Sequence, residues 1–231
     1  MSNELVKNDY TSLPTTSISR TALQEISKAN EFLGRIQLYT KGRAIDTGTI
    51  APGHYGVPQS GSDGILDLGG EIDVLVFAAR AKAMNVSDLE NIVVSYNPED
   101  EAFQDIKSGA DAGDNGNLYG HSFLLYERST SEFYELFCCN KSARIFSPTL
   151  LPFLSLNAAE AEAAGEEPHG PIPATLGVRY AKNKKGSWHA STVKECKAPF
   201  TQEPPFARVV EEVTKFLNPE VAEDDDRERT R

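Results

Sequence analysis

The sequence predicts a mainly β protein with helical additions (α+β), closed either as an OB-like β-barrel or as a compact sandwich. Short runs rich in Val, Ile, Phe and Tyr alternate with turns rich in Gly, Asp, Asn and Pro. Two pairs of these runs flank short polar tips, which is the pattern of β-hairpins. Helical patterns occur only near the ends of the chain and between hairpins, so strands are expected to dominate the core.

At 231 residues the chain is long enough to bury one large core. Residues 1–17 are polar and predict a flexible arm. Residues 18–218 predict a single β-rich domain with a helix at each end, and residues 219–231 predict a disordered acidic tail. The N-terminal helix is expected between a Ser19 cap and Gly34, with Leu23 and Ile26 on its apolar side.

In the first half of the chain, strands are predicted from the alternation in residues 35–40 and from the apolar run 65–84. That run is interrupted at Gly69 and Gly70. Residues 45–64 are so rich in turn-forming residues that no helix is expected there. Residues 91–94 form a further apolar run, and Pro98 with the acids that follow it predicts a short helix.

The second half of the chain predicts two hairpins and two helices. Residues 119–128 and 133–140 flank a polar turn, and residues 175–181 and 187–195 flank the lysine-rich tip KNKKG. Residues 147–157 are interpreted as an apolar turn before an Ala/Glu-rich helix that stops at Gly165. A closing helix over residues 204–218 is expected to bury the stripe Phe206, Val209, Val210, Val213, Phe216 and Leu217.

Positive charge is concentrated beside the single tryptophan, in a chain whose net charge is −11. Residues 176–200 carry six basic residues against one acid, Glu195. Residues 35–45 carry three more basic residues and no acid, whereas the acids cluster in residues 97–114, in residues 158–167 and in the tail. Basic strands beside acidic loops are the pattern expected for a groove that binds a polyanion.

Aromatic residues lie among these basic residues, and flat rings interleaved with Lys and Arg are typical of single-strand binding. The predicted phosphate contacts are Arg35, Lys41, Arg43, Arg179, Lys182, Lys184, Lys185 and Lys194. The predicted stacking residues are Tyr39, Tyr180 and Trp188. Two alternatives remain open at this point: KNKKG is an ordinary solvated turn, and Trp188 is a core residue.

Other chemistries have less support. The four histidines never occur at metal-binding spacing, no phosphate-binding glycine motif is present, and no cofactor is predicted. The three cysteines form neither a disulfide framework nor a zinc quartet. A thiol nucleophile at Cys138 or Cys139, beside His121 across the hairpin, is conceivable; packing of the cysteines is the simpler interpretation. No catalytic residue is therefore assigned.

The order of these features resembles phage-type single-stranded DNA-binding proteins: a β body over residues 35–200, a late helix, and the acidic run Glu223–Asp226. Alternation of that run with Arg227, Arg229 and Arg231 departs from the family pattern. The resemblance implies an OB fold, a role in replication or recombination, and replication proteins as possible partners of the acidic tail.

We therefore expect a non-enzymatic protein that binds single-stranded DNA with low sequence preference, with the formation of an oligomer left open. The sequence contains no apolar run of membrane-spanning length and no secretory signal at its start, so a cytoplasmic location is expected, in the host if the chain is viral. The alternatives are an accessory assembly protein of a virus or phage, and a hydrolase that uses His121 with Cys138 or Cys139.

Overall fold

The computed structural model describes residues 33–59, 64–88, 91–139, 147–164, 171–183, 186–198, 200 and 203–218. Its strands are β1 (Gly34–Arg35), β2 (Gln37–Tyr39), β3 (His54–Pro58), β4 (Ile65–Gly69), β5 (Ile72–Asn85), β6 (Val93–Ser95), β7 (Asn117–Glu127), β8 (Glu132–Cys139), β9 (Ile172–Asn183) and β10 (Gly186–Glu195). Its helices are α2 (Arg43–Asp46), α3 (Glu101–Asp111), α4 (Ser147–Ala163) and α5 (Phe206–Leu217).

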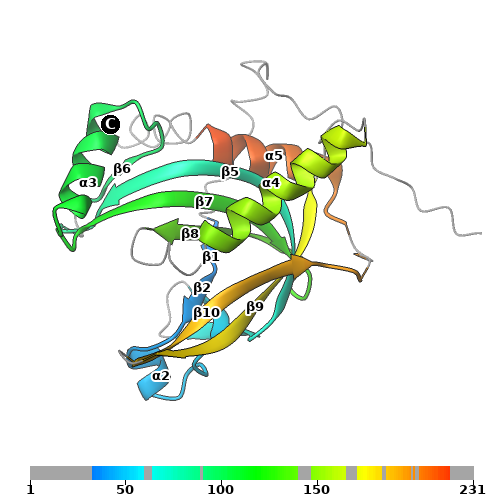
Figure 1. Ribbon diagram of the computed structural model, residues 1–231, viewed down its shortest axis with the longest axis horizontal. Helices are drawn as coiled ribbons and strands as arrows, with labels where there is room; N and C mark the ends of the chain where they lie inside the picture. Colours follow the sequence, from blue (N-terminus) through cyan, green and yellow to red (C-terminus); the bar gives the residue numbers. More distant parts are fainter. Residues whose placement is uncertain are drawn as a thin grey trace, which may run out of the picture.

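The strands form two sheets, shown in Figure 1. The large sheet has the order β1-β8-β7-β5-β9-β10, with β6 beside the end of β5, and the small sheet has the order β2-β3-β4. The 14-residue strand β5 organises the large sheet, because it pairs with β7 along most of its length. On its other side β5 pairs first with β9, over Ile72–Val76, and later with β6, over Ala83–Asn85.

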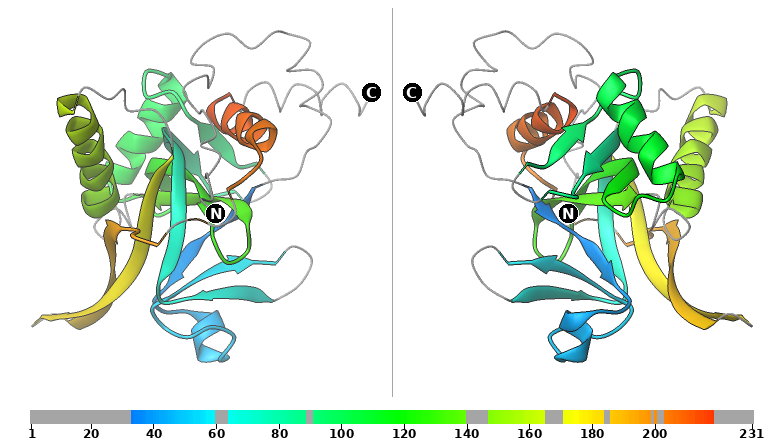
Figure 2. Two further views of the ribbon diagram at one scale, coloured as in Figure 1. Left: turned by 90° about the vertical axis from the view of Figure 1, so that its right-hand side faces the viewer. Right: turned by 90° about the vertical axis from the view of Figure 1, so that its left-hand side faces the viewer.

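Two apolar cores lie on opposite faces of the large sheet. The larger core combines one face of that sheet with α4 and with Tyr55 and Val57 of the small sheet. The second core lies under α5, where Val209 and Phe216 pack against Leu75 and other residues of β5, β7 and β8. Figure 2 shows α4 and α5 on opposite sides of the strands, so the sheet is the middle layer of the molecule.

A β-bulge in β5 decides which of its residues face α5. The register between β5 and β7 shifts between Val76 and Ala78, which leaves Phe77 without an opposite residue. Before the bulge, Val74 and Val76 point into the larger core; after it, the even-numbered Arg80 and Lys82 lie on the face that carries α5. If the same residues followed regular alternation with no bulge, both basic side chains would point into the apolar core.

On the α5 face, three basic side chains share one carboxylate. The buried Lys82 Nζ donates a hydrogen bond to Glu135 Oε1 at 2.7 Å, and Arg35 Nε donates to Glu135 Oε2 at 3.2 Å. Arg80 Nη2 lies 3.9 Å from Oε1, and the Ser122 hydroxyl also donates to that oxygen. The cluster joins β1, β5, β7 and β8 across the sheet, and a lost partner would leave a buried charge unpaired.

The carboxylate is held in its charged form by these neighbours. Burial alone raises the pKa of the Glu135 carboxyl, but Lys82, Ser122 and Arg35 outweigh burial and keep that pKa below its ordinary value. Burial lowers the pKa of the Lys82 ammonium below its ordinary value; Glu135 offsets this only in part, and the nearby positive charges of Arg35 and Arg80 lower that pKa further.

The mainly β, α+β class predicted from the sequence is confirmed, as are both hairpins, the closing helix and the break at Gly69–Gly70. Within the described ranges, however, the strand pairings close no barrel. The expected N-terminal helix, the arm over residues 1–17 and the acidic tail lie outside the described residues. The predicted stripe of α5 holds for Val209 and Phe216, whereas Phe206 and Leu217 are exposed.

Two element predictions were wrong. The expected apolar turn over residues 147–157 is the first part of α4, because its leucines and Phe153 pack on the larger core. Pro152 removes only one backbone donor, whose acceptor four residues earlier would be Pro148 in the first turn. The turn-rich segment 45–64 holds strand β3 and the end of helix α2, where the apolar residues Ile50, Tyr55 and Val57 are buried.

Among the described helices, none combines the length and apolar character that crossing a bilayer would need.

The shared Glu135 carboxylate predicts which of two substitutions lowers the free energy of unfolding more. Because Glu135 holds three cations and Lys82 holds one carboxylate, Glu135→Gln should cost more free energy of unfolding than Lys82→Met. We expect about 3 kcal/mol for Lys82→Met, as for a broken buried pair, and at least about 1 kcal/mol more for Glu135→Gln. The measurement is urea unfolding followed by circular dichroism. The control is Lys215→Met, which breaks a helical i,i+4 pair and should cost less than about 0.5 kcal/mol. Equal costs at Lys82 and Glu135 would contradict the shared arrangement.

Candidate nucleic-acid interface

The β9–β10 hairpin extends beyond the rest of the large sheet. The two strands pair from Ala174–Glu195 to Asn183–Gly186, but β5 accompanies β9 only as far as Leu176. Beyond that residue, β9 pairs with β10 alone among the described strands. Figure 2 shows this distal part of the hairpin extending to one side of the small sheet.

The hairpin contacts the small sheet at its root, through Gly177 and Ser191, and again farther out at His189, which lies opposite Tyr180. The Tyr55 hydroxyl donates to the Gly177 carbonyl at 3.0 Å and is hydrogen-bonded to Ser191 Oγ, also at 3.0 Å. The His189 ring lies against Gly53, where an added Cβ would be 2.8 Å from its Cδ2 atom. Gly53 also has a φ of 84°, so both the backbone and the contact require glycine at this position.

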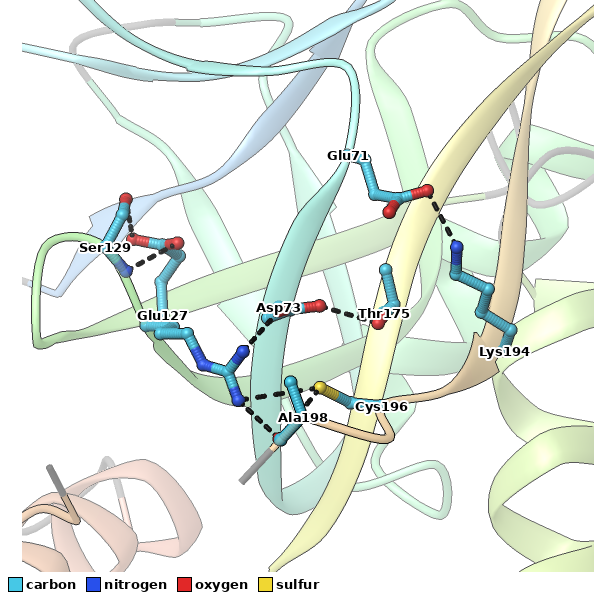
Figure 3. A network of polar contacts seen from close by, with 9 residues as sticks. Glu71, Asp73, Glu127, Ser129, Thr175, Lys194, Cys196 and Ala198 are labelled. Carbon is cyan, nitrogen blue, oxygen red and sulfur yellow. Dashed lines mark hydrogen bonds and ion pairs between the residues drawn. The ribbon is translucent and has the colours of Figure 1, made fainter. Parts of the chain in front are cut away.

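A polar network fixes the same root to the large sheet (Figure 3). The Thr175 hydroxyl donates to Asp73 Oδ1 at 2.6 Å, and Arg128 Nη1 donates to Asp73 Oδ2 at 2.6 Å. Arg128 also donates to the Ala198 carbonyl at 2.5 Å. The projecting part of the hairpin therefore starts from a rigid base.

Each face of the projecting hairpin carries one aromatic and one basic side chain. Tyr180 and Lys182 lie on the face that continues the larger core, because they alternate with Arg179 along the strand. Arg179 and Trp188 lie on the opposite face. Tyr180 is 64% exposed and Trp188 41% exposed, so the alternative that Trp188 is a core residue was wrong.

The surroundings of the two rings differ. Tyr180 is opposite His189, with ring centroids 5.5 Å apart and an interplanar angle of 63°, so the two rings meet edge to face, and Tyr180 stays 64% exposed. Trp188 is opposite Ala181 and two residues from Ala190, and neither small side chain can cover the indole. Both rings are therefore placed to stack with a flat ligand.

The charges near the hairpin divide into paired and unpaired groups. Lys194 lies 2.9 Å from the Glu71 carboxylate at the root, as Figure 3 shows. Arg179 and Lys182 form no ion pair with any described residue, and the same holds for Lys41 and Arg43. Lys184 and Lys185, the predicted contacts at the tip, lie outside the described residues.

The predicted binding residues that precede β3 do not form one continuous surface with the β9–β10 hairpin. Arg35 lies on the α5 face and is paired with Glu135. Tyr39 lies in β2, where partial burial raises the pKa of its hydroxyl. Arg43 begins α2 and Lys41 precedes it, and Figure 2 shows that helix well apart from the distal ends of β9 and β10. The structure thus groups Arg179, Tyr180, Lys182 and Trp188. Tyr39 lies near the hairpin only through its carbonyl, which accepts from the N–H of Gly53 beside His189, and the other three predicted residues lie elsewhere.

The structure argues against Cys138 as a thiol nucleophile. His121 and Cys138 are indeed paired across β7 and β8, but the Cys138 side chain is fully buried in the larger core. Burial raises the pKa of the Cys138 thiol far above neutrality, whereas a thiolate nucleophile needs a lowered pKa. In the part of the chain that the structure describes, no group of three His, Cys, Asp or Glu side chains is arranged to hold a metal ion.

Sequence reasoning missed two polar groupings. One is the Glu135 cluster, whose only signal was the pair of basic residues in the apolar run AARAKAM. The other is His54, whose Nδ1 lies 2.9 Å from Asp67 Oδ1 across β3 and β4. No spacing in the sequence could have paired them, because they are 13 residues apart and a bulge shifts the register between their strands.

Neither a family model, nor a curated protein, nor a solved structure matches this chain.

The exposure of Trp188 gives a direct test of its position. Trp188→Ala should lower the free energy of unfolding by less than about 1.5 kcal/mol, since a half-exposed ring on a projecting hairpin has little packing to lose. Phe123→Ala, which empties a fully buried site, should cost about 3–5 kcal/mol and serves as the reference. Urea unfolding followed by circular dichroism measures both. A Trp188→Ala cost as large as that of Phe123→Ala would place the indole in the core.

Proposed function

We propose that this chain binds single-stranded nucleic acid, DNA in the first instance, through the projecting part of the β9–β10 hairpin. The observation that carries the proposal is the coincidence of two exposed rings, Tyr180 and Trp188, with two basic side chains, Arg179 and Lys182, that no described acid neutralises. Binding is non-enzymatic and has little sequence preference, because every base offers a π face to stack on.

The chemistry of a single strand fits these groups. Unpaired guanidinium and ammonium groups attract phosphates without first breaking an ion pair, and stacking of bases on exposed rings adds affinity that duplex DNA cannot match. Lys184 and Lys185 of the sequence would add charge at the tip. Arg35 and Lys194, which are already paired with acids, contribute less than the sequence suggested.

The broader role is part of the same proposal. We place the protein in replication or recombination, in the cytoplasm, or in that of the host if the chain is viral. The acidic tail would bind replication proteins or compete for the basic hairpin. An OB-like relationship also remains proposed; its support is the contact of Tyr55 with Gly177 and Ser191, which packs the small sheet around the same core as the large one.

A second candidate function is an accessory assembly role. The large sheet ends at β10, which pairs only with β9 among the described strands. An unpaired edge can add a strand from another chain, so an oligomer built through β10 is the competing use of this hairpin.

Binding is tested by fluorescence anisotropy with labelled oligo-dT at several salt concentrations. We expect the logarithm of the affinity to fall with the logarithm of salt, with a slope of about −0.7 for each phosphate neutralised. The double variant Arg179→Ala/Lys182→Ala should reduce that slope by about 1.4. The matched control is Lys215→Ala/Arg208→Ala, which removes the same charge from α5 and should leave the slope unchanged. Undetectable binding at low salt would remove this function in favour of the assembly role.

The acidic tail gives a second binding prediction. If residues 220–226 compete for the hairpin, a chain that ends at Pro219 should bind oligo-dT more tightly, most clearly at low salt where screening is weakest. Replacing Glu223, Asp224, Asp225 and Asp226 with Asn or Gln keeps the length and should reproduce the effect of truncation. Unchanged or weaker binding by both variants would show that the tail does not act as a competitor.

A further inference from the structure

The cluster around Glu135 carries a surplus of positive charge. Lys82, Arg35 and Arg80 approach the Glu135 carboxylate at 2.7, 3.2 and 3.9 Å. Three cations against one carboxylate leave a surplus of two positive charges in this cluster. Arg35 and Arg80 are close enough to Lys82 that their charges lower the pKa of its ammonium group. Charge that is uncompensated away from water is costly, so the cluster has the electrostatics of an anion site.

Arg80 has donors that the described residues do not use. Its Nη1 donates to the Phe216 carbonyl in the last turn of α5. Its Nε is buried without a hydrogen-bond partner among the described residues, and its Nη2 stops 3.9 Å from Glu135 Oε1, beyond hydrogen-bonding distance. Tyr96 also forms a hydrogen bond with Arg80, but a neutral phenol does not cancel the charge. Nε and Nη2 form one edge of the guanidinium, the fork that binds two oxygens of an oxyanion.

Two aromatic rings fix the orientation of this fork. The Arg80 Cζ atom lies 3.7 Å from the centroid of the Tyr96 ring and 4.2 Å from the centroid of the Phe216 ring. Rings that pack on a guanidinium favour contact with its face, and its N–H groups then point outward in the plane. The donor edge is therefore held in place before any ligand arrives, which lowers the entropic cost of binding.

Arg35 is on the open side of the cluster. Its side chain is 49% exposed, whereas the side chains of Arg80 and Lys82 are 12% and 2% exposed. Its Nε donates to Glu135 Oε2, and no other hydrogen bond joins its guanidinium to a described residue. An anion that approaches from solvent would meet Arg35 first and would then lie against the same carboxylate that Arg80 flanks.

We propose that the Glu135 cluster binds a phosphate group, with Arg35 and the Nε–Nη2 edge of Arg80 as its donors. Lys82 stays bonded to Glu135 and contributes charge only. Phosphate monoesters are largely doubly charged at neutral pH, because their second pKa is about 6, and two negative charges match the surplus of the cluster. A phosphodiester, with one charge, matches it less well. The site lies on the α5 face and uses no residue of the hairpin, so it is independent of the proposed function.

Isothermal titration calorimetry of the full chain tests the site. The ligands are inorganic phosphate and, separately, glycerol 3-phosphate, with sodium chloride used to keep the ionic strength constant. Saturable binding of one ligand molecule for each chain is expected. Tighter binding of the ester would identify an organic phosphate as the ligand class, and tighter binding of inorganic phosphate would identify the free anion. If neither ligand binds saturably at millimolar concentration, the proposal is overturned.

Substitution of the exposed donor identifies the site. Arg35→Gln should weaken phosphate binding at least about tenfold, the size expected for a lost hydrogen bond between charged groups. Arg35→Lys keeps the charge without the planar fork and should lose less affinity. The matched control is Arg208→Gln, which removes an arginine that is paired with the single carboxylate of Glu132 and should leave phosphate affinity unchanged.

Urea unfolding separates binding at this site from general salt effects, because phosphate also stabilises proteins by being excluded from their surfaces. Phosphate should stabilise the parent chain and the Arg208→Gln variant more than the Arg35→Gln variant. If Arg35→Gln does not fold, Arg35→Lys carries the same comparison with a smaller expected loss. Equal stabilisation of all the folded chains, or unchanged phosphate affinity after substitution of Arg35, overturns the proposal.

Discussion

The ion-pair cluster around Glu135 is the constraint on which the layered fold depends. A lysine with almost no exposed surface is tolerated in the middle of a sheet only because a carboxylate lies 2.7 Å away. That carboxylate comes from β8, and Arg35 brings β1 to it, so the pairing of distant segments is fixed by electrostatics as well as by apolar contact. Arg80 extends the cluster to α5 by donating to the Phe216 carbonyl and stacking on its ring.

The position of this cluster depends on the β-bulge in β5. The bulge also explains why the sequence alone did not predict the cluster. Alternation correctly predicts β5 as a strand, but it assigns Arg80 and Lys82 to the same face as Val76. The bulge at Phe77 reverses that assignment, and bulges leave no dependable mark in a single sequence. Helix α4 was not predicted, because its two prolines suggest a turn. Packing of its apolar residues on the larger core favours the helix.

Local sequence patterns predicted the hairpin of the candidate site. Only the fold shows which of its basic residues are paired with acids. The tip sequence KNKKG and the alternating residues on either side predict β9 and β10 nearly to their observed limits. The sequence also gave the list of basic residues, but it could not tell which of them had acidic partners. Glu135 is 100 residues from Arg35 and Glu71 is 123 residues from Lys194, and pairs at that separation are visible only in the fold.

This division of charge bears on how an acidic protein can bind a polyanion. The paired cations of the body, such as Lys82 and Arg128, are held by carboxylates through short contacts and are not available to phosphate. The hairpin cations lie where the described surface places no carboxylate within ion-pairing distance, and their attraction for phosphate is strongest at short range because salt screens the more distant acids over about 10 Å. Net charge therefore says little about this surface. In the proposed function, binding depends on Arg179 and Lys182, one on each face of the ribbon, staying unpaired with acidic side chains in the folded chain.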